Sequence, residues 1–367
     1  MSRIDLDQGI LSAKANCLPV VFLGIMGSIQ ISDPIVASLA LVKATQSLGF
    51  SPGTQAIAAS ISTLALAATV VPMGVVADKI GRRRLIVLAL LLTAIGDLVT
   101  AAAPDAGVFL VGRAVAGVGL GAVFAGAFGF VRSVVIPTQL SAALGIFAAW
   151  CSIPLFIFMP LGSAIADISW RITFLMIPVV AIVCAGLCFR ILPDLEPLPP
   201  IKREYWGLAA LAVGVVGMLI GISAAAKDLT SPSAVIPLAI GLLGLAAFAI
   251  IESKSGRAVF PMSLFKSPLF LVGALGGFAW NAAYAAAQLL SSNLWQYVSE
   301  FSALSASLRQ LPIMVASIVA SIFAGRIMGR GRSAVAVLVG GGILTAVGMA
   351  LTGVFASSPN GLLFSFA

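Results

Sequence analysis

The sequence predicts an all-α integral membrane protein, a bundle of about eleven membrane-spanning helices followed by a stub of another. Of its 367 residues, 60% are hydrophobic and only 9% are charged, whereas roughly a quarter of the residues in soluble domains are charged. Stretches without any charged residue recur along the chain, for example at 44–77, 133–166 and 267–299. Each exceeds the ~20 apolar residues that cross a bilayer. Helices are the expected spanning element because they satisfy their backbone hydrogen bonds internally.

The first six expected spans form one group, bounded by charges and by Pro and Gly clusters. The apolar run that begins near residue 17 is too long for a signal peptide, so we interpret it as an uncleaved first span. The predicted spans are 17–41, 54–77, 85–103, 108–130, 139–166 and 172–192. We therefore expect a cytoplasmic N-terminus over 1–16 and an N-terminal six-helix bundle over 17–192.

Five more spans are expected after a cytoplasmic linker at 193–206. They are predicted at 207–225, 233–252, 267–292, 303–325 and 333–356. After a turn signal at 357–361 another apolar run begins, and it ends with Ala367. We interpret 207–252 as two inserted spans and 253–367 as an incomplete C-terminal bundle.

The distribution of Lys and Arg predicts the orientation. With the N-terminus inside, 16 of the 21 basic residues fall at inner loops and span ends, four fall outside, and Arg113 lies within a span. This asymmetry predicts a multi-pass protein of the plasma (inner) membrane with a cytoplasmic N-terminus. The net charge of +8 is thus a topology signal, and the expected partner is the lipid bilayer rather than nucleic acid. We expect a monomer.

Several classes of site are not expected. The chain has no His, and its four cysteines lie in apolar runs without a Cys-x-x-Cys pair, so neither a metal site nor a disulfide scaffold is predicted. No span shows paired carboxylates or a nucleophile elbow, which argues against an enzyme. Without a P-loop signature, ATP coupling is not expected either, and no cofactor is predicted.

Three ionisable residues, Asp33, Asp97 and Arg113, fall well inside predicted spans. Each costs ~2.5–3.5 kcal/mol at a helix centre on insertion scales, so a function is expected for them. Asp97 precedes Pro104 by seven residues and Arg113 follows Gly107 by six, which sets both ~9–10 Å below the tip of one hairpin. One interpretation is a proton relay formed by Asp33, Arg113 and Asp97, with Asp33 as the titrating group and Arg113 tuning it. The alternative is a structural Asp97–Arg113 ion pair with Asp33 facing a watery vestibule.

Two further patterns lie on single helix faces. Small residues recur every fourth position behind Arg113, at Gly117, Gly121, Ala125 and Gly129. Such a face allows a neighbouring helix to pack closely, and it can also serve as a surface for rocking.

A polar stripe at Asn281, Tyr284 and Gln288, with Trp280 beside it, predicts a substrate-binding surface. Hydrogen bonding between helices is the alternative. Gln30 is a further candidate for substrate binding, and Trp295 is interpreted as an interfacial anchor.

The loop between the second and third spans carries Asp78 and four bases within a glycine-bounded segment. Its residues are Gly74-Val75-Val76-Ala77-Asp78-Lys79-Ile80-Gly81-Arg82-Arg83-Arg84. Asp78 is expected to pair with a base or a helix N-terminus and to close the inner side, while Gly74 and Gly81 allow a close approach and a tight turn. A plain positive-inside loop is the alternative.

This loop resembles the signature of the major facilitator superfamily, Gly-x-x-x-Asp-Arg/Lys-x-Gly-Arg-Arg/Lys-Arg/Lys. Arg113 with its following glycines resembles the fourth-span motif of that family, whose Arg is associated with proton coupling. Asp33, in Ile31-Ser32-Asp33-Pro34, is similar to the first-span acidic position of the drug:proton antiporters. An echo of the loop signature at 325–332 follows the tenth span, as in the fourteen-span antiporter group. The stretch 260–265 resembles that group too.

The resemblance implies a major-facilitator-type bundle that lacks its last three spans. Its implied function is proton-coupled export of hydrophobic or cationic organic compounds by alternating access, with the proton gradient as the energy source. The span-5 segment Met159-Pro160-Leu161-Gly162-Ser163 departs from the antiporter turn, so proton-linked uptake of a small organic solute stays open. A non-transporting membrane sensor or an inactive remnant is the alternative of another class. We expect the 367-residue form to transport poorly.

Overall fold

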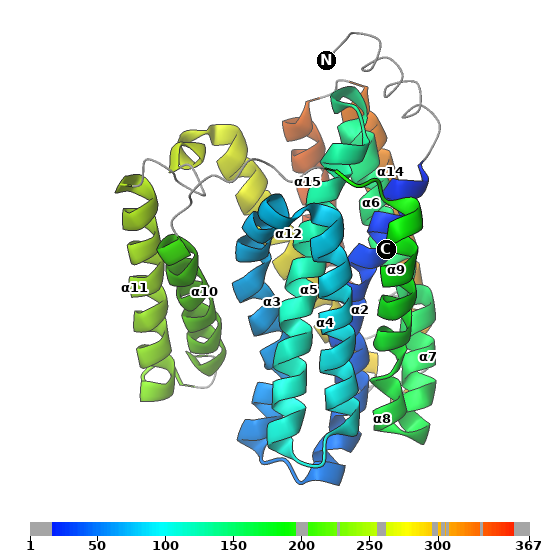
Figure 1. The fold of residues 1–367 in the computed structure, drawn as a ribbon, viewed down its shortest axis with the longest axis vertical. Helices are drawn as coiled ribbons and strands as arrows, with labels where there is room; N and C mark the ends of the chain where they lie inside the picture. Colours follow the sequence, from blue (N-terminus) through cyan, green and yellow to red (C-terminus); the bar gives the residue numbers. More distant parts are fainter. Residues whose placement is uncertain are drawn as a thin grey trace. The chain divides into compact units, whose positions relative to one another are not determined.

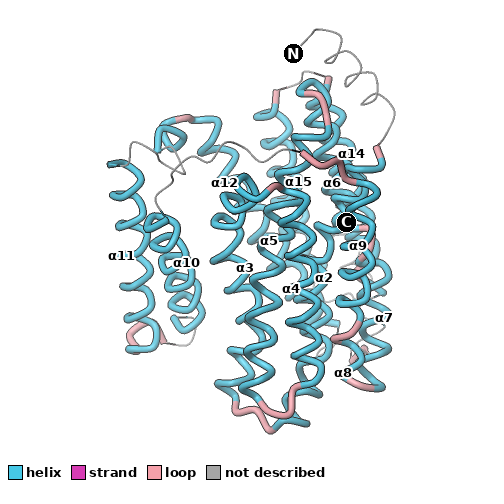
Figure 2. The backbone as a smooth tube through the Cα atoms, in the orientation of Figure 1, coloured by secondary structure: helices cyan, strands magenta, loops and turns pink. Residues whose placement is uncertain are grey.

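The computed structural model describes residues 17–195, 205–225, 228–254, 262–295, 300–301, 305, 308–330 and 333–355, and within them every regular element is a helix (Figures 1 and 2). The longer helices are α2 (Leu18–Leu48), α3 (Pro52–Ile80), α4 (Arg82–Ala102), α5 (Ala106–Val134), α6 (Leu140–Ser152), α7 (Leu155–Ile168), α9 (Met176–Ile191), α10 (Tyr205–Ala225), α11 (Pro232–Lys254), α12 (Pro268–Asn293), α14 (Leu311–Gly329) and α15 (Ala334–Phe355). Short helices are η1 (Pro137–Gln139), α8 (Trp170–Thr173) and η2 (Met262–Lys266). Eleven helical segments are long and apolar enough to cross a membrane, which confirms the predicted fold class. The expected twelfth stub lies outside the described residues.

Two span boundaries differ clearly from the predicted ones. The first span continues to Leu48 rather than 41, because Pro34 is accommodated inside α2 and the helix ends only before Gly49, whose φ of 64° suits a glycine after a helix C-terminus. The tenth begins at Leu311 rather than 303. Pro312 lies in the first turn there, the position where its fixed φ and missing N–H are tolerated best.

The fifth and sixth spans are each divided. The segment Pro137–Ile168 consists of η1, α6 and α7. Ile153 and Pro154 separate α6 from α7, because proline lacks the N–H that would continue the first helix. The sixth span, Trp170–Ile191, is divided into α8 and α9, with Phe174 and Leu175 between them.

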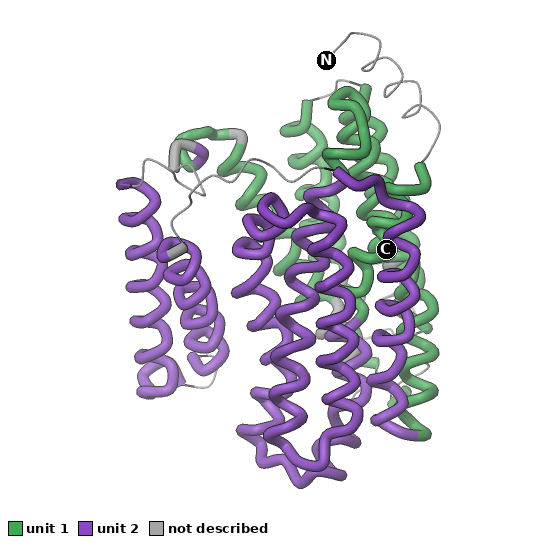
Figure 3. Tube along the Cα trace, viewed as in Figure 1, with its two compact units in different colours: residues 1–32, 131–168, 265–367 green, residues 33–130, 169–264 purple. Residues whose placement is uncertain are grey.

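The chain divides into two compact units, coloured separately in Figure 3. One comprises residues 33–130 and 169–264, in which α4 packs on α9, α10 pairs with α11, and α3 contacts α10. The other comprises the described residues of 1–32, 131–168 and 265–367, in which α6 packs on α14 and α12 on α15. Many large apolar side chains are exposed, such as Leu243 and Leu344; in a membrane-spanning chain, lipid would cover such side chains.

The contact between α6 and α14 depends on a pair of glycines. A Cβ on Gly145 would lie 3.0 Å from the Cα of Gly325, and a Cβ on Gly325 would lie 3.0 Å from the Cα of Gly145. The Gly145 position also faces the Ser321 carbonyl oxygen, at 2.7 Å from such a Cβ. The two backbones therefore touch without any side chain between them, as small residues permit in membrane helices.

Candidate functional site

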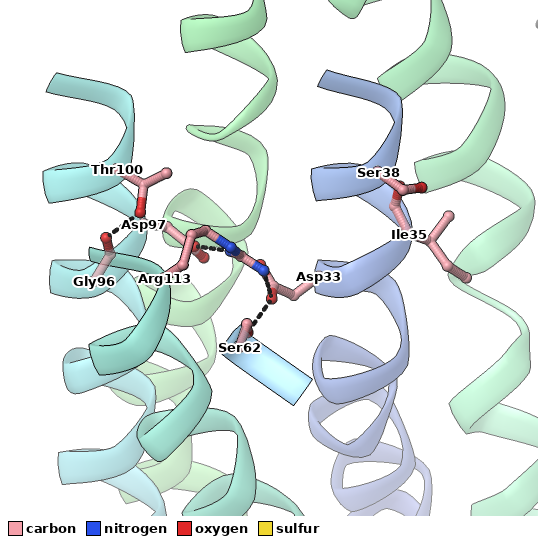
Figure 4. A network of polar contacts seen from close by, with 8 residues as sticks. All are labelled: Asp33, Ile35, Ser38, Ser62, Gly96, Asp97, Thr100 and Arg113. Carbon is pink, nitrogen blue, oxygen red and sulfur yellow. Dashed lines mark hydrogen bonds and ion pairs between the residues drawn. The ribbon is translucent and has the colours of Figure 1, made fainter. Parts of the chain in front are cut away.

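The three charged residues predicted inside the membrane meet in one network (Figure 4). Arg113 on α5 donates from Nη1 to Asp33 Oδ1 at 2.9 Å and from Nη2 to Asp33 Oδ2 at 2.7 Å. Its Nη1 also donates to Asp97 Oδ1 of α4, at 2.7 Å. Ser62 of α3 donates to Asp33 Oδ2 at 3.4 Å. One guanidinium therefore joins two carboxylates that come from α2 and α4, a set that we call the Asp33–Arg113–Asp97 triad.

Glycines bring the supporting helices close enough for these contacts. A Cβ on Gly96 would lie 2.3 Å from the backbone nitrogen of Ala116, so α4 and α5 touch directly beside Asp97. A Cβ on Gly117 would lie 2.3 Å from the carbonyl oxygen of Ser62, and Gly121 meets the Thr69 hydroxyl in the same way. Gly117 and Gly121 of α5 thus pack against α3, which positions Ser62 beside Asp33.

The triad is shielded from the surroundings of the protein. The exposed fractions of Asp33, Asp97 and Arg113 are 1%, 0% and 2%. The Arg113 guanidinium carbon lies 5.4 Å from the ring centre of Phe174, within cation–π range. Burying a charge this deeply costs free energy unless the charge is paired, and ionisable residues inside membrane spans usually have a function. The triad is therefore a candidate functional site on physical grounds.

A small cavity lies next to the triad within the same unit. Its volume is about 30 Å³, and its lining includes Arg113 and Ser62 together with Ser38, Thr63 and Phe109. Such a volume has room for a water molecule, and the hydroxyl groups supply the polar partners that a water needs. The cavity thus borders Arg113 and Ser62, the two residues that donate hydrogen bonds to Asp33.

Sequence reasoning did not find two groups that stabilise this site. Ser62 lies in the charge-free run 44–77, where nothing distinguishes it from other small polar residues. Arg171 is one of the four basic residues counted outside and was given no further role, yet its Nη1 donates to the carbonyl oxygens of Ala101 and Ala103 at 2.7 and 2.9 Å. It thereby satisfies carbonyl groups at the C-terminal end of α4, the helix that carries Asp97.

The loop between α3 and α4 has a definite internal structure. Asp78 pairs with Arg82 at 3.1 Å, one helical turn on. Gly81 joins the two helices with a φ of 94°, which is the tight turn expected of a glycine. A Cβ on Gly74, in contrast, would meet no other atom within 4 Å, so the close approach expected at Gly74 is not seen among the described residues.

The remaining bases of the loop differ from one another. Arg83 forms an ion pair with Asp194 and donates to the Leu192 carbonyl oxygen at 3.3 Å, so it holds the chain that leaves α9. Lys79 and Arg84 form no ion pair within the described part of the chain. One base of the four thus pairs with Asp78.

A larger cavity lies between α12, α14 and α15. Its volume is about 420 Å³, and its lining residues are uncharged, among them Trp280, Tyr284, Ile313, Ser317, Thr345 and Met349. The rings of Trp280 and Tyr284 stack at a centroid distance of 5.5 Å and an angle of 16°. An apolar cavity with aromatic rings and a few hydroxyl groups suits an organic ligand.

The predicted polar stripe is only partly at this cavity. Tyr284 lines it, but Asn281 is exposed and donates to the Gly277 carbonyl oxygen of its own helix at 2.9 Å. The Gln288 side chain lies outside the described residues, and Gln30 is half-buried on α2 without lining the cavity. The interpretation of Trp295 as an interfacial anchor is wrong, since it is fully buried in a cluster with Ile313.

Comparison with known proteins decides the family. Residues 21–367 match the family described as Major Facilitator Superfamily. The chain belongs to this superfamily. The helical architecture agrees with this assignment. The fold of this superfamily member is similar to that in the crystal structure of the human organic anion transporter MFSD10 (TETRAN), with a TM-score of 0.57. That likeness covers 98% of this chain and 82% of MFSD10 at 19% identity, so it bears on the fold alone.

Curated relatives of this superfamily member include transporters from bacteria and fungi. It is 27% identical over 258 residues to the multidrug transporter protein MdtP of Bacillus subtilis, covering 70% of this chain and 48% of MdtP. It is 29% identical over 310 residues to the MFS-type transporter TOXA of Cochliobolus carbonum, covering 80% of this chain and 54% of TOXA. The chain thus spans about half the length of these relatives.

Proposed function

We propose that this chain acts in a secondary active transporter that couples proton movement to the export of hydrophobic or cationic organic compounds. The single observation that carries the proposal is the two-bond ion pair between Asp33 and Arg113 inside the spans. A titratable carboxylate that can exchange a guanidinium for a proton supplies the coupling step of alternating access. The name of the relative MdtP, a multidrug transporter, supports the substrate class.

The binding of substrate is assigned to the cavity between α12, α14 and α15. Trp280 and Tyr284 offer stacked ring faces there, which attract apolar rings and organic cations alike. We keep Gln30, Asn281 and Gln288 as candidates for substrate binding in a state of the transporter in which the spans are arranged differently. The substrate itself is a small organic molecule.

The loop 74–84 is proposed to close the inner side of the transporter. The Asp78–Arg82 pair and the Gly81 turn fix the loop, and its basic residues favour the cytoplasmic side of the plasma membrane. This orientation places the N-terminus in the cytoplasm.

The test is proton-driven efflux from membrane vesicles that carry the protein. With an imposed proton gradient, Asp33→Asn is expected to abolish gradient-driven movement of a fluorescent organic cation such as ethidium. Asp228→Asn, a change of an exposed loop residue between α10 and α11, is the matched control and should transport normally. Unchanged efflux by Asp33→Asn would remove Asp33 from the mechanism. Accumulation in the direction of the protons, rather than against them, would establish uptake instead of export.

A further inference from the structure

The Asp33–Arg113–Asp97 triad contains more negative than positive charge. Two carboxylates face one guanidinium, and all three side chains are at most 2% exposed. With both carboxylates ionised, the buried group would carry a net charge of −1, which a low-dielectric interior strongly disfavours. A single bound proton would make the triad neutral.

The hydrogen bonds indicate which carboxylate takes the proton. Asp33 accepts two bonds from Arg113 and one from Ser62, so both of its oxygens have donors. Asp97 accepts one bond, on Oδ1, and its buried Oδ2 has no hydrogen-bond partner among the described residues. Because hydrogen bonds to a carboxylate favour its charged form, the negative charge belongs on Asp33.

No other donor on α4 replaces the missing one. The hydroxyl groups of Thr93 and Thr100, one turn on either side of Asp97, donate to the carbonyl oxygens of Ala89 and Gly96 of their own helix, at 2.9 and 2.8 Å. Neither hydroxyl proton is therefore available to Asp97.

The helices around α4 do not supply a second base either. The ionisable groups on the helices that contact α4 or the triad are Asp33 and Lys43 on α2, Asp78 and Lys79 at the far end of α3, Arg113 and Arg132 on α5, Arg171 on α8, and Cys184, Cys188 and Arg190 on α9. Arg171 is bonded to the carbonyl oxygens at the end of α4. Among the described residues, Arg113 is the base that pairs with Asp97.

We propose that Asp97 holds a proton while Asp33 is paired with Arg113, and that Asp97 is thus a second proton-binding residue of this site. Arg113 Nη1 donates to an oxygen of each carboxylate, so the two oxygens lie within 5.6 Å of one another, the sum of the two bond lengths. When the proton leaves Asp97, two negative carboxylates share the single positive charge of Arg113 and repel one another, which weakens the Asp33–Arg113 pair. That this proton is the transported one rests on the proposed function, but the protonation of Asp97 itself does not.

The first test compares the pH dependence of stability in two variants of the purified chain. Asn is a neutral isostere of a protonated Asp and does not ionise when the chain unfolds, so Asp97→Asn should be at least as stable as wild type near pH 6. In wild type the folded state holds one more proton than the unfolded state between the ordinary pKa of an unfolded Asp, about 4, and the pH at which folded Asp97 gives up its proton. Across this window the unfolding equilibrium constant should rise about tenfold per pH unit, and above it the rise should level off. Asp97→Asn should lack this rise.

Asp33→Asn supplies the comparison, because it removes the carboxylate that the three hydrogen bonds stabilise. It should be less stable than Asp97→Asn at every pH. The proposal would be overturned if Asp33→Asn were the more stable variant, or if Asp97→Asn failed to fold where Asp33→Asn folds. It would also be overturned if the stability of wild type and of Asp97→Asn changed with pH in the same way.

The second test is infrared spectroscopy of the same samples. A protonated carboxylic acid has a C=O stretching band that a carboxylate lacks, and wild type should show it at neutral pH. The band should vanish in Asp97→Asn and persist in Glu252→Gln, the control for another buried carboxyl group. A missing wild-type band, or one unchanged in Asp97→Asn, would refute the assignment. Neither readout needs transport, so a protein that shows the band but moves no protons across vesicles refutes only the proposed function.

Discussion

Arg113 and Asp33 lie 80 positions apart in sequence and form two parallel hydrogen bonds of 2.9 and 2.7 Å in the interior of one unit. The geometry requires the planar guanidinium, because a lysine ammonium is a point charge that cannot present two parallel N–H groups to a carboxylate. The same Arg113 also serves Asp97, so its removal leaves two buried carboxylates.

We therefore expect Arg113→Ala to lower the free energy of unfolding by about 3–5 kcal/mol, the usual result of breaking a buried ion pair from one side. Arg113→Lys should lose less, since it keeps the charge. Denaturant unfolding of the purified protein in detergent measures both. Arg190→Lys, at an exposed position near the end of α9, is the control, and an Arg113→Ala protein as stable as wild type would contradict the pairing.

The contact between α5 and α3 at Gly117 gives a second prediction. A methyl group there would meet the Ser62 carbonyl oxygen and the Ala65 Cβ, so Gly117→Ala should push α3 away and cost about 1–3 kcal/mol of stability. Gly186→Ala on α9 meets no atom within 4 Å and should be neutral or stabilising, because Ala favours helix. Thermal unfolding of the two variants checks this, and equal melting temperatures would show that the contact is not tight.

The two glycines of the loop 74–84 should respond in opposite ways. Gly81 has a φ of 94°, which an L-residue with a Cβ adopts only with strain, so Gly81→Ala should cost about 1–3 kcal/mol. Gly74→Ala has free space around it and should be tolerated. The amount of folded protein recovered from membranes, followed by thermal unfolding, distinguishes them; greater damage from Gly74→Ala would argue for a contact in another state.

The ring stack in the cavity between α12, α14 and α15 predicts a binding difference. Trp280→Ala should weaken the binding of a planar aromatic cation such as ethidium about tenfold, because it removes the larger stacking surface. Trp280→Phe should retain most of the affinity. Fluorescence titration of the purified protein provides the measurement, with Trp206→Ala, an exposed position on α10, as the control. Equal affinity for Trp280→Ala and the control would remove this cavity from substrate binding.

Sequence patterns that extend over many residues were sufficient to predict the spans and the depth of two charged residues within them. Long apolar stretches with few charges identified all eleven spanning segments, and the distance of Asp97 and Arg113 from one turn placed them at the same height. The structure joins these two residues by a 2.7 Å bond. Depth along a helix follows from counting residues, since each adds about 1.5 Å.

Rotation about the helix axis was harder to predict than depth. Asn281 and Tyr284 are three residues apart and were expected on one inward face, yet Asn281 is exposed and bonded to its own backbone. The carbonyl group one turn back is always within reach of a side-chain amide, and no sequence pattern shows which partner it takes. Ser62 and Arg171 were missed for a related reason, because their partners come from other helices.

The glycine pair Gly145 and Gly325 has a genetic consequence. When a bulky side chain damages a packed interface, a smaller residue across the interface often restores the fit. Here each position faces the other's Cα, so neither partner has a side chain left to shorten. Second-site suppressors of a Gly145→Ala or Gly325→Ala defect should therefore map elsewhere, to positions that let one backbone shift away from the other.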